Sequence, residues 1–159
     1  LMFSKELRQI DPYLKSPYQS NTSKLYDGGS GLVSNIDDYA QFALMLMNKG
    51  ELNGVRILSE SSVEMMSKNH LSDSVLSDGA AFGLDGIGFG LTMAVVEDAG
   101  RAGTYSTKGE FSWGGAASTT FWVDPVNQLT AVMMTQYMPS DKYPLREDLK
   151  TLIYSGLSN

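Results

Sequence analysis

The chain has 159 residues, enough for one domain with a buried core, and 42% of them are hydrophobic. Its formal net charge is −6 and it has no basic stripe, which excludes nucleic acid as the expected partner because nothing would neutralise the phosphates. The absence of cysteine and the single histidine exclude a disulfide framework, a thiol nucleophile and a histidine-rich metal site, so neither a metal nor a cofactor is expected. No apolar run reaches the roughly 18 residues of a membrane span. The composition leaves a periplasmic, secreted or cytoplasmic location equally open.

The first part of the chain predicts a loop followed by two helices. Residues 1–31 are predicted to be mostly loop, because proline, serine, tyrosine and glycine are frequent among them. After Ser34, an apolar face with the spacing i, i+3, i+4 and i+7 predicts a helix that ends at Gly50. The pair Asn53-Gly54 predicts a tight reversal, and Ser59 is placed as the N-cap of the second helix. The apolar face of the first helix consists of Tyr39, Phe42, Ala43 and Leu46.

The middle of the chain predicts strands. Residues 71–88 are polar and glycine-rich and are predicted to be loop. From residue 89 to residue 95 apolar side chains alternate with small or polar ones, which predicts a strand. Two further strands are predicted at 117–123 and 129–136, joined by a turn at 124–128.

The end of the chain predicts one more helix and completes the fold class. Pro144 suits the first turn of a helix, because the missing amide hydrogen of proline costs nothing there. The apolar stripe of this helix is Leu145, Leu149, Leu152 and Ile153. The elements together predict an α/β fold of the α+β type, with an antiparallel sheet of three to four strands flanked by helices.

The residues alone do not predict a complete active site. No G-x-S-x-G elbow is present, and no lysine has a serine three residues before it. His70 closes a weakly amphipathic helix and is interpreted as a surface or capping residue. The neighbouring carboxylates Asp37 and Asp38, like Glu97 and Asp98, stand at an expected helix start and strand end, where solvated or dipole-complementing roles are favoured.

The pair Gly114-Gly115 is the most distinctive feature of the chain. It follows Trp113 inside a segment that otherwise reads as strand. Glycine in a strand indicates either a bulge or a place where a ligand or another backbone comes very close. Both interpretations are open on the local pattern.

The order of several motifs resembles the C-terminal half of the serine β-lactamase-like family. This family includes class C β-lactamases, related penicillin-recognising enzymes and esterases of the same fold. The motifs are G-G-x-G-L-x-S-x-x-D-D-Y from residue 28, the Asn-Gly turn, Trp113-Gly114-Gly115, and the D-P-x-N hairpin from Asp124. The resemblance covers about residue 27 to the end, and it implies that residues 1–159 are one incomplete domain, the C-terminal part of a β-lactamase/transpeptidase-like fold.

The resemblance also implies site residues. Trp113, Gly114 and Gly115 match the family's third catalytic box, which lies on a sheet-edge strand and contacts substrate. The backbone N–H of Ala116 is then expected to be one of two oxyanion-hole donors. The family's Ser-x-x-Lys nucleophile and base and its Tyr-x-Asn element lie upstream of the matched region, and this chain contains neither; the "YQSN" at residues 18–21 has one residue too many.

Two functions are therefore expected. The first is a fragment of a serine hydrolase whose parent cleaves acyl esters or amides through an acyl-serine, with the 159-residue chain inactive by itself. Trp113 favours a neutral small-molecule acyl substrate, because indole lacks the positive charge that would hold a carboxylate. The alternative is a non-catalytic binding module that uses the loop 11–31.

The resemblance implies a partner for the last strand. In the family's sheet this strand lies between other C-terminal strands and one from the N-terminal segment that this chain lacks. Residues 129–136 are then an apolar edge, and such an edge invites pairing. The expected partner is the missing N-terminal segment or, by self-association, a second copy of the chain.

Overall fold

The computed structural model describes residues 28–29, 32–79, 84–140 and 142–157. The chain divides into two units, Leu1–Asn35 and Ile36–Asn159. The loop predicted at 11–31 lies almost entirely outside the described residues. The described fold is therefore that of the second unit, and none of its described helices is long and apolar enough to cross a membrane.

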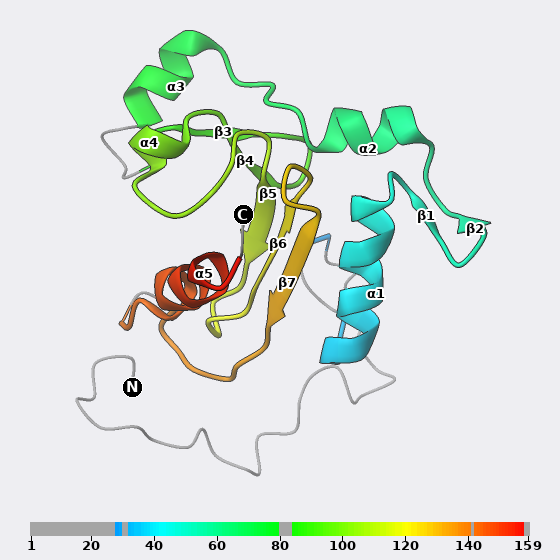
Figure 1. Cartoon of the computed structure of the whole chain (residues 1–159). Helices are drawn as coiled ribbons and strands as arrows, with labels where there is room; N and C mark the ends of the chain where they lie inside the picture. The colour runs from blue at the N-terminus through cyan, green and yellow to red at the C-terminus, as the bar shows by residue number, and fades with distance from the viewer. Residues whose placement is uncertain (1–27, 30–31, 80–83, 141, 158–159) are drawn as a thin grey trace. The chain divides into compact units, whose positions relative to one another are not determined.

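The centre of the fold is a five-stranded antiparallel sheet in the order β3-β4-β5-β6-β7 (Figure 1). A separate two-stranded hairpin, β1-β2, follows the first helix. The strands are β1 (Glu51–Leu52), β2 (Val55–Arg56), β3 (Ile87–Phe89), β4 (Ala94–Val96), β5 (Phe111–Gly114), β6 (Thr120–Asp124) and β7 (Leu129–Met133). The helices are α1 (Ile36–Met47), α2 (Glu60–Met66), α3 (Asp73–Gly79), α4 (Ala99–Ala102) and α5 (Leu145–Ser155). The fold is of the α+β type, as the sequence predicts.

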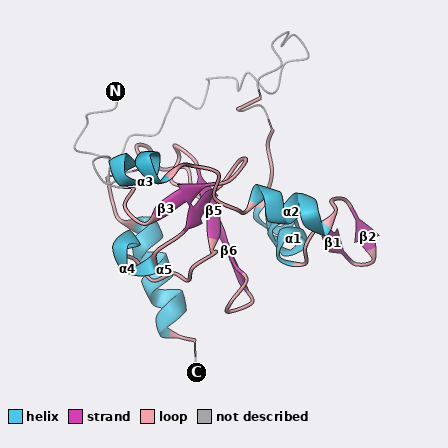
Figure 2. Ribbon diagram, turned by 90° about the horizontal axis from the view of Figure 1, so that it is seen from above, coloured by secondary structure: helices cyan, strands magenta, loops and turns pink. Residues whose placement is uncertain are grey.

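Helices cover both faces of the sheet. α1 and α2 lie on one side of it, and α4 and α5 lie together on the other (Figures 1 and 2). β6 shows why, because its side chains alternate: Phe121 and Val123 join the apolar core, while Trp122 and Asp124 lie on the α5 side. The core between sheet and α1 consists of Ala43, Met45, Leu46, Val63, Met93, Val95, Phe111, Phe121 and Val123.

Local signals in the first part of the unit agree with the structure. Asn53 and Gly54, with φ of 52° and 78°, form the tight reversal between β1 and β2. Ser59 caps α2, and its hydroxyl accepts a hydrogen bond from the amide of Ser62 at 3.1 Å. Gly50 follows α1 with φ of 95°, a conformation that favours glycine.

The sheet is larger than predicted because one predicted strand is two. The segment expected as a single strand at 89–95 folds back on itself, so that Phe89 pairs with Ala94 across a turn. Gly90 makes this turn possible: its amide donates to the carbonyl of Met93, and a Cβ on it would lie 1.9 Å from the carbonyl oxygen of Met66. The described sheet thus has five strands, where the sequence predicts three to four. The loop predicted at 71–88 also contains a helix, α3.

Candidate active site

Trp113 and Gly114 end β5, the third strand of five. β5 pairs with β4 on one side and with β6 on the other, so the expectation of a sheet-edge strand is wrong for the sheet of the described residues. The pairing with β4 stops at Ser112, however, so β4 does not extend beside Trp113 and Gly114. The Trp113 side chain is 51% exposed and lies edge-on against Phe89, with ring centroids 5.4 Å apart.

The chain leaves β5 through a tight turn with Ala116 near its tip. The amide of Ser118 donates to the carbonyl of Gly115 at 3.1 Å, and the amide of Gly115 donates to the carbonyl of Thr119 at 3.0 Å. These bonds close the turn and leave the two amides at its centre outside its hydrogen bonds. Ala116 is exposed, and its amide donates to no atom of the described residues.

The two glycines are closely packed against neighbours. A Cβ on Gly114 would lie 2.7 Å from Cζ and Nη2 of Arg146 and 2.9 Å from the carbonyl oxygen of Thr119. A Cβ on Gly115 would lie 2.5 Å from the Thr119 hydroxyl. Internal packing therefore supplies a reason for both glycines, alongside the close approach of a ligand that the sequence left open.

Arg146 lies near the start of α5 and binds the turn between β5 and β6. Its Nη2 donates to the carbonyl of Gly115 at 2.8 Å and to that of Thr119 at 3.1 Å. The guanidinium suits this role because its donors form a rigid planar fork. Its Nε, though buried, has no partner among the described residues.

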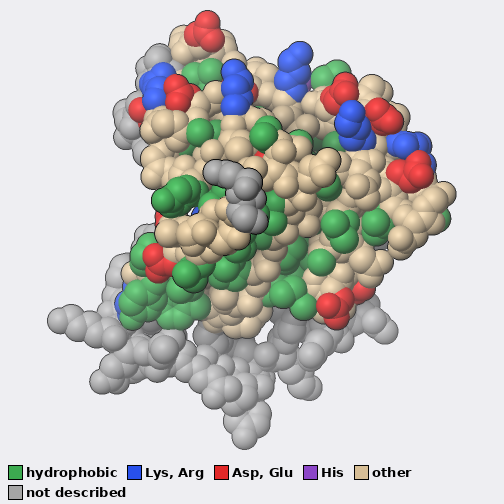
Figure 3. All heavy atoms as spheres, in the orientation of Figure 1, with side chains coloured by type: hydrophobic (Ala, Val, Ile, Leu, Met, Phe, Trp, Pro, Cys, Tyr) green, Lys and Arg blue, Asp and Glu red, His purple; other side chains and the backbone are tan. Residues whose placement is uncertain are grey.

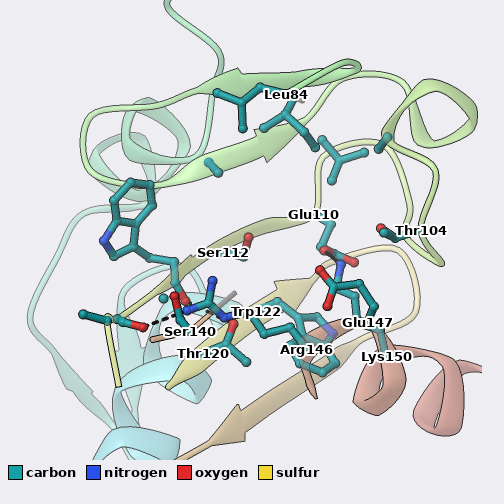
Figure 4. Close-up of a pocket in the computed structure, with 18 residues that line it drawn as sticks. Leu84, Thr104, Glu110, Ser112, Thr120, Trp122, Ser140, Arg146, Glu147 and Lys150 are labelled. Atoms are coloured by element: carbon teal, nitrogen blue, oxygen red, sulfur yellow. Dashed lines mark hydrogen bonds and ion pairs between the residues drawn. The ribbon is translucent and has the colours of Figure 1, made fainter. Parts of the chain in front are cut away.

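A cavity of about 580 Å³ lies on the α5 side of the sheet, where residues of α5 and of strands β3 to β6 line it (Figure 4). All four residues predicted for the site line it: Trp113, Gly114, Gly115 and Ala116. Leu84 lies on the wall opposite α5, and Glu110 points toward Lys150 and Glu147 (Figure 4). The floor includes Trp122, which is 1% exposed and whose indole nitrogen has no partner among the described residues.

A buried polar cluster ties α5 to the sheet beyond this cavity. Lys150 Nζ contacts Glu110 Oε1 and lies 5.5 Å from the centre of the Trp122 ring. The Tyr154 hydroxyl oxygen lies 2.7 Å from Glu110 Oε2 and 2.6 Å from Asp124 Oδ2. Because a phenol has a single proton, it cannot donate to both carboxyl groups at once. The Tyr154 hydroxyl therefore donates its proton to one of the two carboxyl groups at a time.

The environments of the two carboxyl groups shift their pKa values in opposite directions. Burial raises the pKa of Glu110, and the contacts with Lys150 and Tyr154 offset this only in part. Burial also acts to raise the pKa of Asp124, but hydrogen bonds from Thr107, Tyr154 and Asn127 outweigh it and hold that pKa below its usual value. Burial, with the bonds to both carboxyl groups, raises the pKa of Tyr154 itself. Of the two carboxyl groups, Glu110 is thus the one that takes up a proton at the higher pH.

Other residues that the sequence offered for chemistry lie apart from this site. His70 Nε2 is 2.8 Å from the carbonyl oxygen of Met65, as expected of a capping residue. Within the described ranges, no cluster of histidine, aspartate and glutamate suits a metal ion.

The sequence reasoning missed the α5 side of the site. Arg146, Lys150 and Tyr154 repeat at i, i+4 and i+8, which places them on one face of a helix. That spacing is visible in the sequence, but the same helix also has an apolar stripe, which is the usual signal for the buried face. Glu110, next to the strand that ends in Trp113 and Gly114, carried no signal of its burial.

Comparison with known proteins shows to which family this fold belongs. The family model described as Beta-lactamase matches residues 4–154. Two curated relatives from Mycobacterium tuberculosis, Protein Rv1367c of strain H37Rv and Uncharacterized protein MT1414 of strain CDC 1551, are each 37% identical over 119 residues, covering 71% of this chain and 29% of the relative.

Two solved structures are similar in fold. EstCE1, described as a hydrolase with promiscuous acyltransferase activity, is 26% identical with a TM-score of 0.66, covering 80% of this chain and 31% of that one. Simvastatin Synthase (LovD) from Aspergillus terreus is 21% identical with a TM-score of 0.63, covering 80% of this chain and 36% of that one.

An antiparallel sheet between helical layers, with a glycine-rich strand end beside a cavity, defines a fold shared with hydrolases and acyltransferases. The chain belongs to the Beta-lactamase family, as the sequence resemblance predicts. It spans 29% of the length of the curated relatives that it matches. The roles predicted for Trp113, Gly114, Gly115 and Ala116 stay predictions.

Proposed function

We propose that this chain is the C-terminal part of a serine hydrolase that cleaves acyl esters or amides through an acyl-serine. Its contribution is one wall of the substrate site, formed by Trp113, Gly114 and Gly115, and the amide of Ala116 as one oxyanion donor. The observation that carries the proposal is the exposed turn in which the Ala116 amide has no partner among the described residues. A fixed, unpaired backbone N–H beside a cavity is the kind of donor that stabilises a developing oxyanion.

The remaining machinery is proposed to come from the rest of the full-length protein. The acyl step needs a serine hydroxyl activated by a base, and the second oxyanion donor is the amide of that serine. The family membership and the acyl-transfer chemistry of EstCE1 support this division. The 159-residue chain alone is then inactive.

Trp113 favours neutral acyl groups over substrates that carry a carboxylate. An indole offers an apolar face and a single N–H, whereas a lysine or histidine in its place could supply a positive charge. Because the side chain is 51% exposed, it remains available to a substrate.

The test compares two substrate classes with the full-length protein. We expect short-chain nitrophenyl esters to be hydrolysed at least about tenfold faster, by kcat/KM, than a cephalosporin, which corresponds to roughly 1.4 kcal/mol of discrimination. The variant Trp113→Lys should narrow this ratio by lowering KM for the cephalosporin, because it restores a cation for the carboxylate. Trp113→Phe, which keeps an aromatic face and introduces no charge, is the matched control and should leave the ratio nearly unchanged.

A fluorophosphonate probe tests the division of the machinery. It should label the full-length protein on one serine and leave the 159-residue chain unlabelled. Stoichiometric labelling of the short chain would overturn the division, and equal rates on esters and cephalosporins would overturn the substrate preference.

A further inference from the structure

We propose that Arg146 is a positioning residue that orients and strengthens the Ala116 amide as an oxyanion donor. The proposal rests on the proposed function of that amide and adds the element that holds it. Arg146 comes from α5 and reaches a turn that is about thirty residues earlier in the chain, where it binds the carbonyls of Gly115 and Thr119.

The bond to Gly115 acts directly on the Ala116 amide, because both belong to one peptide group. The carbonyl oxygen of Gly115 and the N–H of Ala116 lie in the same plane and point in opposite directions across a trans peptide bond. Fixing the oxygen at 2.8 Å from Arg146 Nη2 therefore fixes the direction of the N–H, away from the guanidinium. A charged donor on the oxygen also polarises the peptide group and makes its N–H a stronger donor.

The second bond fixes the other end of the turn. The carbonyl of Thr119 accepts from Arg146 at 3.1 Å and from the amide of Gly115 at 3.0 Å, so one guanidinium spans both ends of the turn. Gly114 provides the space: a Cβ there would lie 2.7 Å from Cζ and Nη2 of Arg146. The guanidinium thus packs against the strand end at a position that only glycine leaves open.

The contact of Arg146 with both ends of the turn is called the clamp here. The remaining contacts of the turn and of the helix make this clamp rigid. The Ser118 hydroxyl donates to the carbonyl of Tyr137 at 2.8 Å, and the Thr135 hydroxyl donates to the carbonyl of Ala117. Two helical turns beyond Arg146, Tyr154 is anchored to Glu110 and Asp124. Arg146 is therefore held in place by the register of α5 on the sheet, and not only by its own bonds.

The chain offers a matched control for this clamp. Arg56 also binds two backbone carbonyls, those of Lys49 at 2.9 Å and Leu58 at 3.1 Å, through its Nη1. It lies in the β1-β2 hairpin and does not line the cavity. Replacing either arginine removes hydrogen bonds to two backbone carbonyls, and replacing Arg56 by alanine also removes its ion pair with Glu51. Only Arg146 acts on the Ala116 peptide.

The experiment uses the full-length protein with Arg146→Ala, Arg146→Lys, Arg56→Ala and Arg56→Lys. We expect Arg146→Ala to lower kcat for a nitrophenyl ester by about 100-fold, the effect of a roughly 1 Å misplacement, with KM changed less than about threefold. Added guanidinium ion should restore part of the kcat of Arg146→Ala. Arg146→Lys keeps the positive charge but loses the planar fork of donors, so its kcat should lie between those of wild type and Arg146→Ala. Both Arg56 variants should keep wild-type kcat.

A second readout needs no turnover. The ¹⁵N resonance of the Ala116 amide responds to hydrogen bonds accepted by its own peptide carbonyl, so it should shift in both Arg146 variants and stay in place in both Arg56 variants. An unchanged Ala116 resonance, or an equal loss of kcat in the Arg56 variants, would overturn the positioning role. If the wild-type protein hydrolyses neither esters nor amides, the proposed function fails, and the Ala116 resonance alone decides the role of Arg146.

Discussion

The Tyr154 hydroxyl contacts two buried carboxyl groups whose environments differ. Glu110 and Asp124 are both fully buried, yet their pKa values move in opposite directions. Asp124 accepts five hydrogen bonds, from Thr107, Val126, Tyr154 and both nitrogens of Asn127, which favours its ionised form. Glu110 has fewer donors around it, and burial raises its pKa.

Replacing Glu110 by glutamine should remove a pH dependence without unfolding the protein. Because the folded-state pKa of Glu110 is raised, its contribution to stability is complete below the unfolded pKa and is lost as the pH rises through the folded pKa. Glutamine keeps an oxygen for Lys150 and supplies a permanent N–H to Tyr154. The free energy of unfolding of Glu110→Gln, relative to wild type, should therefore increase from acidic toward neutral pH. Chemical denaturation across this range measures it.

Two further variants serve as comparisons for Glu110→Gln. Glu147→Gln changes an exposed carboxylate that lines the same cavity, and it serves as the surface control. Glu110→Ala leaves the ammonium of Lys150, whose side chain is only 14% exposed, without its partner, and should cost about 3–5 kcal/mol. Parallel pH profiles for wild type and Glu110→Gln would contradict the raised pKa of Glu110.

At the scale of the element, α5 docks through its polar side. Arg146, Lys150 and Tyr154 contact the sheet and the turn that follows β5, whereas Leu152, predicted to lie in the core-facing stripe, is 70% exposed. A helix normally buries its apolar stripe. Here buried charges and hydroxyls on the sheet provide enough partners for the polar side, so hydrogen bonding sets the orientation of the helix.

The turn between β6 and β7 depends on Asp124 in the same way. Asp124 holds the amides of Val126 and Asn127 and also reaches Thr107 and Tyr154, so it joins the turn, a loop and α5. We expect Asp124→Ala to lower the free energy of unfolding by at least about 3 kcal/mol, because several donors lose a charged acceptor in a buried place. Equilibrium denaturation measures the loss.

Asp98→Ala is the matched comparison for Asp124. Asp98 also accepts a backbone amide bond, from Arg101 at 3.1 Å, but it caps a short helix on the surface. Its loss should cost only about 1 kcal/mol, the usual value for an N-cap. Equal losses for the two variants would show that burial and the link to α5 add nothing to the Asp124 turn.

Local signals predicted the elements that are governed by local chemistry. The Asn53-Gly54 reversal, the Ser59 cap and the turn after Asp124 each depend on one or two residues with a strong conformational preference, and each is confirmed. The hairpin at β3-β4 was missed because its signal is the packing of Gly90 against Met66, a contact far along the chain. Pattern alone cannot register such a contact.

In the candidate site, too, the residues with a local signal were predicted and those held by distant contacts were missed. The segment from Trp113 to Ala116 was found because its glycines break a strand pattern and its order of motifs resembles a family. Arg146 was missed because its partners are backbone carbonyls, which every residue has and which leave no trace in a sequence. Burial of a polar residue is decided by tertiary packing, and the alternation of polar and apolar residues cannot show it.

At the scale of the whole molecule, the described surface and the sheet order bear on partners. On the face shown in Figure 3, lysine and arginine side chains are interspersed with aspartate and glutamate, and hydrophobic side chains gather below them. The sheet of the described residues ends at β7, whose five residues are all partly buried. α1 covers one face of this strand, and β6 pairs with one of its edges, so the other edge has no strand partner among the described residues.

We propose that this free edge of β7 pairs with a strand from the rest of the full-length protein or, when the 159-residue chain is alone, with a second copy. Backbone N–H and C=O groups along an apolar edge strand form a template for another strand. Sedimentation of the isolated chain should therefore show mass that increases with concentration. Adding the N-terminal part as a separate chain should replace this association by a one-to-one complex.

Two lysine substitutions decide whether β7 is the surface involved. Ala131→Lys places a charge on the edge strand, opposite Trp122 in the register with β6, and should reduce association at a given concentration by about tenfold, because lysine on an edge opposes pairing. Val55→Lys changes an exposed apolar residue on the separate β1-β2 hairpin and should leave association unchanged. A wild-type chain that stays monomeric at high concentration would contradict the proposal, and so would association that responds to Val55→Lys and not to Ala131→Lys. The geometry favours β7 over β2 because a five-residue strand offers a second chain more backbone partners than a two-residue one.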